Sequence, residues 1–160
     1  GRFEDITAKA GPGLETVKAS RGLAAGDIDR DGDVDLLVLN VLDKADVLRN
    51  DSEHRNHWLS VRAVGGARGM SRDGNRNLTN RDGVGARIVV KTDDRTQVKD
   101  VHSSASYLSA NPREVHFGLG LADRVVEIEI RWPSGVVDRV TNVGVDQRIV
   151  IHEGQSGVSH

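Results

Sequence analysis

The residues best suited to chemistry lie in segment 27–35, whose sequence is DIDRDGDVD. Aspartate occupies every second position of this segment, and glycine occupies the sixth. Carboxylates spaced this closely repel one another unless a cation lies between them. Ca²⁺ binds about six to eight oxygen atoms, and a D-x-D-x-D-G spacing is typical of loops that supply them. The sequence therefore predicts Ca²⁺ as a cofactor, bound by Asp27, Asp29, Asp31, Asp33 and Asp35.

The segments on each side of this loop indicate how it is held. We expect Asp33 to contribute its main-chain carbonyl group, and Gly32 to supply the sharp turn. A helix–loop–helix calcium site would carry glutamate at the twelfth position, where this sequence has Val38. Segments 23–28 and 35–40 have the apolar pattern of strands, so the loop is predicted to lie in a β-hairpin. The alternatives are a solvated acidic turn without an ion, or Mg²⁺, which keeps more water ligands than Ca²⁺.

The sequence contains no motif for catalysis. The six histidines include no H-E-x-x-H or H-x-x-E-H spacing, no G-x-S-x-G segment is present, and cysteine is absent. Asp82 is interpreted as a turn residue beside Gly83 and Gly85, with a second ion site as the alternative. His116 is expected to pack or to form hydrogen bonds. We therefore predict a protein that is not an enzyme.

Charge and composition exclude several classes of partner. The 160 residues carry a formal net charge of only -2, which does not favour nucleic acid or an anionic membrane surface. No apolar run approaches the roughly 20 residues that a spanning helix needs, so no membrane insertion is expected. Asn50 and Asn77 match the N-x-S/T pattern, and the sequence leaves their glycosylation open.

Short runs rich in valine and isoleucine set the fold class. Segment 126–132 alternates cleanly, with Val126, Ile128, Ile130 and Trp132 predicted on one face. Trp58 and Trp132 are expected at or near the core, with an exposed, sugar-stacking tryptophan as the alternative. Turn signals separate the runs, and no long helical period is present. The sequence predicts an all-β chain with a β-sandwich or jelly-roll-like part. Further strands are expected at 86–91, 97–102, 136–140 and 148–153.

The first third of the chain resembles an FG-GAP (VCBS-like) repeat. The resemblance lies in RGLAAGDIDRDGDVDLLVLN (21–40) and ADVLRND (45–51). GRFEDIT (1–7) resembles the last strand of such a repeat. Repeats of this type form the blades of β-propellers, so the resemblance implies a blade-like β-unit around the predicted calcium loop.

The remainder resembles the ASPIC/UnbV domain, which follows FG-GAP repeats in exported bacterial proteins and in cartilage acidic protein. The matching segments are NHWLSVR (56–62), NRDGVGARIVV (80–90), SYLSAN (106–111), VHFGLG (115–120) and IEIRWPSG (128–135). Two departures stand out. The chain has SSASYLSA where the family often has GGSGYLSQ, and segment 65–79, with Arg68, Arg72 and Arg76, is predicted to be an extended surface loop.

These observations predict three regions. They are an FG-GAP-like calcium-binding β-unit (1–55), an ASPIC/UnbV-like β-domain (56–154) and a flexible tail (155–160). The expected function is that of an exported, calcium-stabilised β-module at the cell surface or outside the cell, used in adhesion or assembly. One alternative is a filament subunit whose strand Phe3–Thr7 adds to a neighbouring copy. The other is a domain that binds carbohydrate or assists glycan processing. The expected partners are therefore a protein, a second copy or a glycan.

Overall fold

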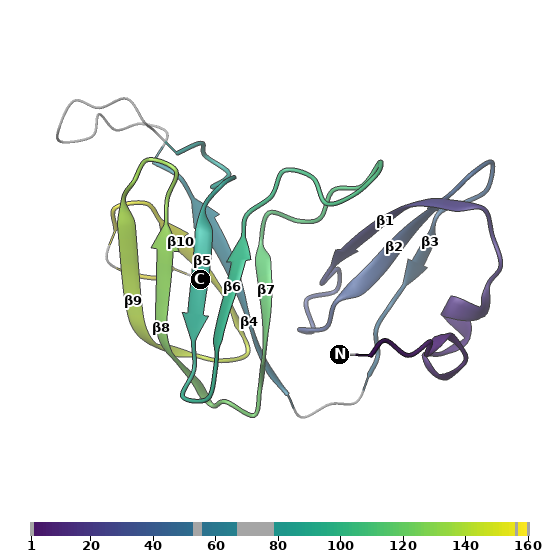
Figure 1. The fold of residues 1–160 in the computed structure, drawn as a ribbon, viewed down its shortest axis with the longest axis horizontal. Coiled ribbons are helices and arrows are strands. Elements are labelled where there is room, and N and C mark those ends of the chain that lie inside the picture. Colours follow the sequence, from purple (N-terminus) through teal and green to yellow (C-terminus); the bar gives the residue numbers. More distant parts are fainter. Residues whose placement is uncertain (1, 53–55, 67–78, 156, 160) are drawn as a thin grey trace. The chain divides into compact units, whose positions relative to one another are not determined.

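The computed structural model describes residues 2–52, 56–66, 79–155 and 157–159. The described residues form ten strands, two short 3₁₀ helices and no α-helix, so the predicted all-β class is confirmed (Figure 1). None of the described helices is long and apolar enough to cross a membrane. The strands are β1 (Ser20–Gly26), β2 (Asp35–Asn40), β3 (Asp46–Leu48), β4 (His57–Val64), β5 (Arg87–Lys91), β6 (Thr96–Asp100), β7 (Val115–Gly120), β8 (Arg124–Arg131), β9 (Val137–Gly144) and β10 (Gln147–His152).

The chain folds into two compact units. The first unit combines residues 1–52 with residues 104–111, and the second combines residues 53–103 with residues 112–160. The sequence predicted a boundary after residue 55, close to residue 52, where the chain first passes from the first unit to the second. It did not predict that a segment between β6 and β7 belongs to the first unit.

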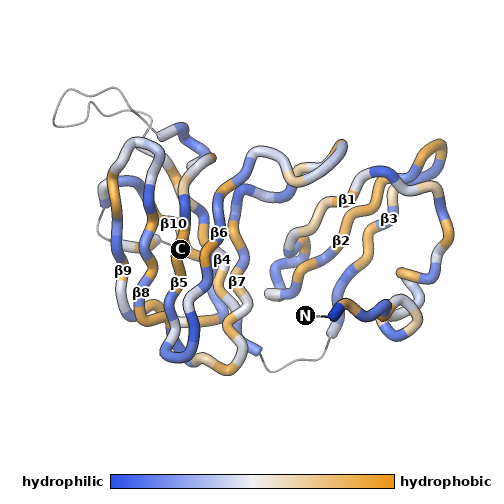
Figure 2. Tube along the Cα trace, in the orientation of Figure 1, coloured by the Kyte–Doolittle hydropathy of each residue, from blue (hydrophilic) through white to orange (hydrophobic). Residues whose placement is uncertain are grey.

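The first unit contains one antiparallel sheet in the order β1-β2-β3. Strand register places Leu23 opposite Val38 on one face, and Ala24 opposite Leu37 on the other. Strand β3 adds Leu48 to the first of these faces and Val47 to the second. Both faces therefore carry apolar residues, and Figure 2 shows hydrophobic colours along β2. Among the described residues of this unit, no hydrophobic side chain is fully buried.

Segment 104–111 closes the free edge of β1. The main-chain N–H of Leu23 donates to Ser109 Oγ at 2.8 Å, and that of Ala25 donates to Asn111 Oδ1 at 2.9 Å. An antiparallel bridge between Ser106 and Ser109 shapes the segment itself. Side chains, rather than another strand, therefore satisfy outward-pointing donors of β1.

The prediction of a strand at Phe3–Thr7 is wrong for the isolated chain. Residues 2–6 belong to no strand, and the 3₁₀ helix η1 (Thr7–Lys9) begins where the strand was expected to end. Asp5 Oδ1 accepts hydrogen bonds from both the main-chain N–H and the hydroxyl of Thr7. This local turn competes with extended backbone. A second 3₁₀ helix, η2 (Pro12–Glu15), follows, and Phe3 is fully exposed.

The second unit is a β-sandwich. One sheet has the order β10-β4-β7, with β10 parallel to β4, and the other has the order β6-β5-β8-β9. Apolar residues from both sheets form one buried cluster, which includes Leu59, Ile88, Phe117 and Ile130. The sandwich predicted from the alternating pattern is therefore confirmed.

The two tryptophans differ in their surroundings. Trp132 is 4% exposed and its Nε1–H donates to Asp138 Oδ2 at 2.6 Å, as expected for a core anchor. Trp58 is half-buried and stacks on His116, with ring centroids 5.9 Å apart. His116 packs as predicted, and its Nδ1 lies 3.5 Å from Ser60 Oγ.

The predicted face of segment 126–132 is correct from Ile128 onward and wrong at Val126. Val126 is 39% exposed, whereas Val125 is fully buried. Val125 pairs with Val143, and Asn142 on the neighbouring strand has a positive φ of 56°. A left-handed residue interrupts the regular pleat, so the inward side of β8 changes at this point.

Other predictions concern loops and the chain end. Gly83 has φ of 65°, and a Cβ atom there would lie 2.6 Å from the carbonyl oxygen of Ala63, so the predicted close approach is confirmed. Asp82 forms an ion pair with Arg62 at 2.7 Å.

Ser159 forms a bridge with Val150, so part of segment 155–160, predicted to be flexible, is attached to β10. Arg68, Arg72, Arg76 and Asn77 lie outside the described residues.

Candidate metal centre

The aspartate-rich segment forms the turn between β1 and β2, as predicted. Two residues of this turn have left-handed backbone, Arg30 with φ of 68° and Gly32 with φ of 101°. Glycine adopts this conformation without steric cost, whereas arginine does so only when its surroundings hold it there. The turn is consequently tight enough to direct several carboxylates toward one region.

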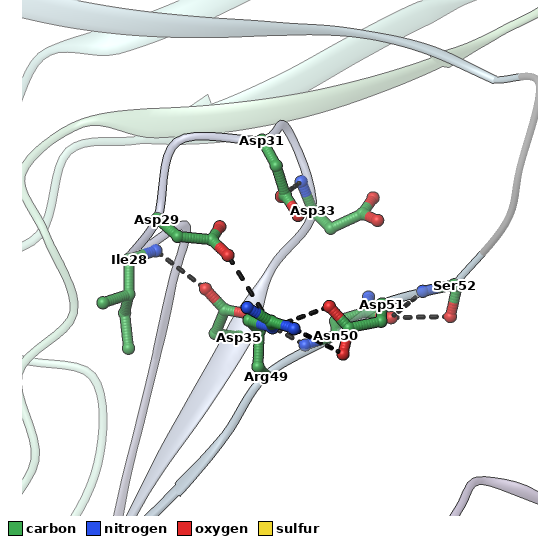
Figure 3. A network of polar contacts seen from close by, with 9 residues as sticks. All are labelled: Ile28, Asp29, Asp31, Asp33, Asp35, Arg49, Asn50, Asp51 and Ser52. Atoms are coloured by element: carbon green, nitrogen blue, oxygen red, sulfur yellow. Dashed lines mark hydrogen bonds and ion pairs between the residues drawn. The ribbon is translucent and has the colours of Figure 1, made fainter.

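Asp35 anchors the site. It is the first residue of β2 and is only 1% exposed. Its Oδ2 accepts a hydrogen bond from the main-chain N–H of Ile28, and its Oδ1 accepts one from that of Asn50, both at 2.8 Å (Figure 3). One carboxylate thus connects the start of the turn with the chain that leaves β3. The two main-chain donors together satisfy both oxygens of this buried carboxylate.

Three carboxylates converge on one point. Asp27, Asp29 and Asp35 each offer an oxygen atom, and the three oxygens lie within 4.8 Å of one another. Asp27 Oδ2 accepts a hydrogen bond from the main-chain N–H of Gly32, whereas Asp27 Oδ1 is buried without a hydrogen-bond partner among the described residues. A buried carboxylate oxygen without a partner is costly, and a cation would remove that cost.

The electrostatics of the carboxylate cluster also favour a bound cation. Burial raises the pKa of Asp29, and the negative charges of Asp31 and Asp35 raise it further. A raised pKa means that the surroundings of the Asp29 carboxyl group disfavour its ionised form. A divalent cation at the cluster would reverse this effect, because its charge favours the ionised carboxylates.

The side chains of the other two aspartates, Asp31 and Asp33, lie apart from this group. Asp31 Oδ1 accepts a hydrogen bond from the main-chain N–H of Asp33 at 2.8 Å, which shapes the tip of the turn. Figure 3 shows both side chains at the tip, away from Asp35. Of the five aspartates in the predicted site, the structure therefore brings together three.

Sequence reasoning missed Arg49 and Asn50. Arg49 follows β3, and its Nε lies 3.9 Å from Asp29 Oδ2 and 2.6 Å from Asp51 Oδ1. Asn50 contributes its main-chain N–H to Asp35, while its side-chain oxygen accepts hydrogen bonds from Ser52. No spacing rule marks these residues, because they reach the turn only through the pairing of β2 with β3.

The donor set fits a hard divalent cation. All side-chain groups of the cluster are carboxylates, the ligands that Ca²⁺ and Mg²⁺ prefer over softer metals. Three carboxylates, supplemented by main-chain carbonyl groups and water, suit the high and flexible coordination number of Ca²⁺. Asp27, Asp29 and Asp35 would hold the ion, and the unpartnered oxygen of Asp27 is the observation that supports this fit.

Comparison with known proteins addresses the second unit. No curated protein matches the chain. The model of the ASPIC and UnbV family matches residues 76–158, about half of the sequence, and these residues lie almost entirely in the β-sandwich and its loops. Several segments that carried the resemblance in the sequence, among them 80–90 and 128–135, fall inside this match. The chain therefore belongs to the ASPIC and UnbV family.

Proposed function

We propose that this chain is a calcium-stabilised β-module of an exported protein, with a role in adhesion or assembly outside the cell and no catalytic activity. The observation that carries the proposal is the convergence of Asp27, Asp29 and Asp35 around a buried carboxylate oxygen that has no hydrogen-bond partner in the described part of the chain. The resemblance of the first unit to an FG-GAP repeat supports the same conclusion.

The ion would act as a structural cross-link. Asp27 and Asp29 lie in the turn, and Asp35 begins β2 and holds the main chain at Asn50. An ion bound to all three carboxylates joins the turn to the strands on each side. Because this arrangement exists only in the folded unit, binding stabilises the fold by mass action.

The sheet of the first unit supports a role in assembly. Its two faces carry Leu23, Leu36 and Val38 on one side and Leu37 and Leu39 on the other. A sheet that is apolar on both faces is typically covered on both. Further β-sheets of the same type would provide that cover, as neighbouring blades do in a propeller. A protein partner or a second copy of the chain is therefore the proposed partner.

Thermal unfolding with and without calcium tests the proposal. At a calcium concentration about a hundredfold above the dissociation constant, binding adds roughly 2.7 kcal/mol to the stability of the first unit. We expect a chelator to lower the melting temperature, and Asp29→Asn to abolish most of the response to calcium. The measurement is differential scanning calorimetry of the full chain.

Asp43→Asn provides the matched control. Asp43 is an exposed aspartate of the same unit, outside the carboxylate cluster, and it lies 3.6 Å from Lys18. This variant should retain the full calcium response. A melting profile that is identical in calcium and in chelator would show the proposal to be wrong.

A further inference from the structure

The outer face of the four-stranded sheet in the sandwich carries an open hollow of about 400 Å³. Ile88 and Ile130 point into the core, so the residues next to them, Arg87 and Arg131, lie on the opposite face. The hollow lies at the ends of β5, β6 and β8, and all of its lining residues belong to the second unit. It is lined by Gly85, Arg87, Asp100, Val101, His102 and Arg131.

Two arginines stand directly opposite each other in this hollow. Arg87 on β5 and Arg131 on β8 are partners in the strand register. Like charges in directly opposite positions of an antiparallel pair are destabilising. Asp100 compensates one of them, because its two oxygens accept hydrogen bonds from Arg87 Nε at 2.8 Å and from Arg87 Nη2 at 3.1 Å.

The second arginine is only partly compensated. Arg131 Nε donates to Glu129 Oε1 at 2.7 Å, but the other oxygen of Glu129 accepts a hydrogen bond from Arg139. Three arginines on this face therefore share two carboxylates, those of Asp100 and Glu129. Within the described part of the chain, the terminal Nη groups of Arg131 donate no hydrogen bond, and its side chain is 63% exposed.

We propose that this hollow binds an oxyanion, a carboxylate or sulfate group that is either free or carried by an acidic sugar. The fork of an arginine matches two oxygens of such a group, and Arg131 has that fork unoccupied in the described residues. Arg87, which pairs with Asp100, faces the hollow from the neighbouring strand, and His102 also lines it. Central strands hold these groups in place, so little ordering is needed on binding.

The lining contains no phenylalanine, tyrosine or tryptophan, which indicates the class of ligand that the hollow can bind. Neutral sugars are commonly held by stacking on aromatic rings, and no aromatic residue other than His102 lines this hollow. Recognition must then depend on charge and hydrogen bonds. A volume of about 400 Å³ lies at the lower end of the range for small-ligand sites, which suits a single sugar unit or a free anion.

The test is a ligand titration of the full chain at constant ionic strength, monitored by the NMR chemical shifts of the backbone amides. The probes are glucuronate, inorganic sulfate and, as the neutral counterpart, glucose. We expect saturable shifts near Arg87, His102 and Arg131 with an anionic probe and none with glucose. Tighter binding of glucuronate than of sulfate would show that the hollow recognises an anionic group carried by a sugar. Equal binding of the two would show that it recognises the free anionic group alone.

Single arginine-to-glutamine substitutions test whether the anion binds in this hollow. Arg131→Gln should weaken binding roughly tenfold, the loss expected for one charge-assisted contact. Arg87→Gln should weaken it as well. Arg124→Gln is the control, because Arg124 lies at the other end of β8, is 56% exposed and pairs with Asp93. Melting temperatures of all variants verify that they fold.

Three outcomes would overturn the inference: no saturable shift with either anion, equal shifts with glucose, or equal weakening by Arg124→Gln. The calcium proposal is tested separately, because its residues belong to the other unit. A chelator should leave the anion titration unchanged even where it alters thermal unfolding.

Discussion

At the scale of single residues, the molecule stabilises buried carboxylates in two ways. Asp35 is held by main-chain N–H groups, which are fixed in position by the turn and by the chain after β3. Glu129 is 7% exposed in its side chain and is held by two arginines that are themselves exposed. The first arrangement is local to the hairpin, whereas the second depends on the pairing of β8 with β9.

Glu129 predicts a dependence of stability on pH. Hydrogen bonds from Arg131, and then from Arg139, lower the pKa of Glu129 below its ordinary value. Its contribution to stability is therefore present above the unfolded pKa of about 4.3 and is lost as the pH falls through the lower folded value. We expect Glu129→Gln to lower the melting temperature at neutral pH and to flatten its decline in acid.

Melting temperatures measured from neutral to strongly acidic pH provide the check on Glu129. Glu127→Gln is the comparison, because Glu127 lies on the same face and pairs with a single lysine, Lys91. Its effect should be smaller. Equal slopes in acid for the wild type and Glu129→Gln would contradict the assignment.

At the scale of elements, side chains close one edge of the sandwich. Strand β6 belongs to one sheet and β7 to the other. Gln97 Nε2 donates to the carbonyl oxygen of Gly118 at 2.8 Å, and Lys99 Nζ donates to that of His116 at 2.7 Å. Lys99 also lies over the ring of Phe117, 5.4 Å from its centroid. These contacts cover acceptors of β7 that would otherwise be open to another strand.

Removal of these donors should expose the edge of β7. The double variant Gln97→Met with Lys99→Met keeps side-chain length but leaves both carbonyl groups without their donors. We expect a loss of about 1–3 kcal/mol in the free energy of unfolding and a greater tendency to aggregate. Urea unfolding measures the first effect and light scattering the second.

Val98→Thr is the control for this edge. Val98 lies between the two donors on the outer face of β6 and is 54% exposed. Its replacement should change neither stability nor aggregation appreciably. If the double variant behaves like this control, the contacts to β7 contribute little.

At the scale of the whole molecule, the two units are not sequential blocks of chain. Segment 104–111 leaves the sandwich between β6 and β7 and becomes part of the first unit. Its contacts join residues 86 positions apart in the sequence, such as Ala25 and Asn111. The first 52 residues alone therefore lack part of their own unit.

Asn111→Ala should weaken the first unit locally. The change removes the acceptor of the Ala25 N–H, and we expect a loss of about 0.5–1.5 kcal/mol. Hydrogen exchange of the full chain should show faster exchange at Ala25. Ser104→Ala, an exposed position at the start of the segment, should leave this amide protected. Unchanged protection in Asn111→Ala would exclude this role for the segment.

Much of the fold and part of the site could be predicted from local sequence pattern. Alternation of apolar and polar residues placed Ile128, Ile130 and Trp132 in the core correctly. It failed at Val126, because a left-handed residue on the neighbouring strand, Asn142, determines the pleat there. The resemblance to an FG-GAP repeat placed a strand at residues 3–7, where a hydrogen-bonded turn at Thr7 forms instead and residues 2–6 belong to no strand.

The sequence by itself determined the acidic turn, the all-β class and the family, because these depend on residue types at fixed short spacings. Only the tertiary structure decided which three aspartates converge, which main-chain donors hold Asp35, and that Arg87 faces Arg131. It also assigned segment 104–111 to the first unit. The physical reason is that strand register and docking join residues far apart in the chain, and no local spacing specifies such pairs.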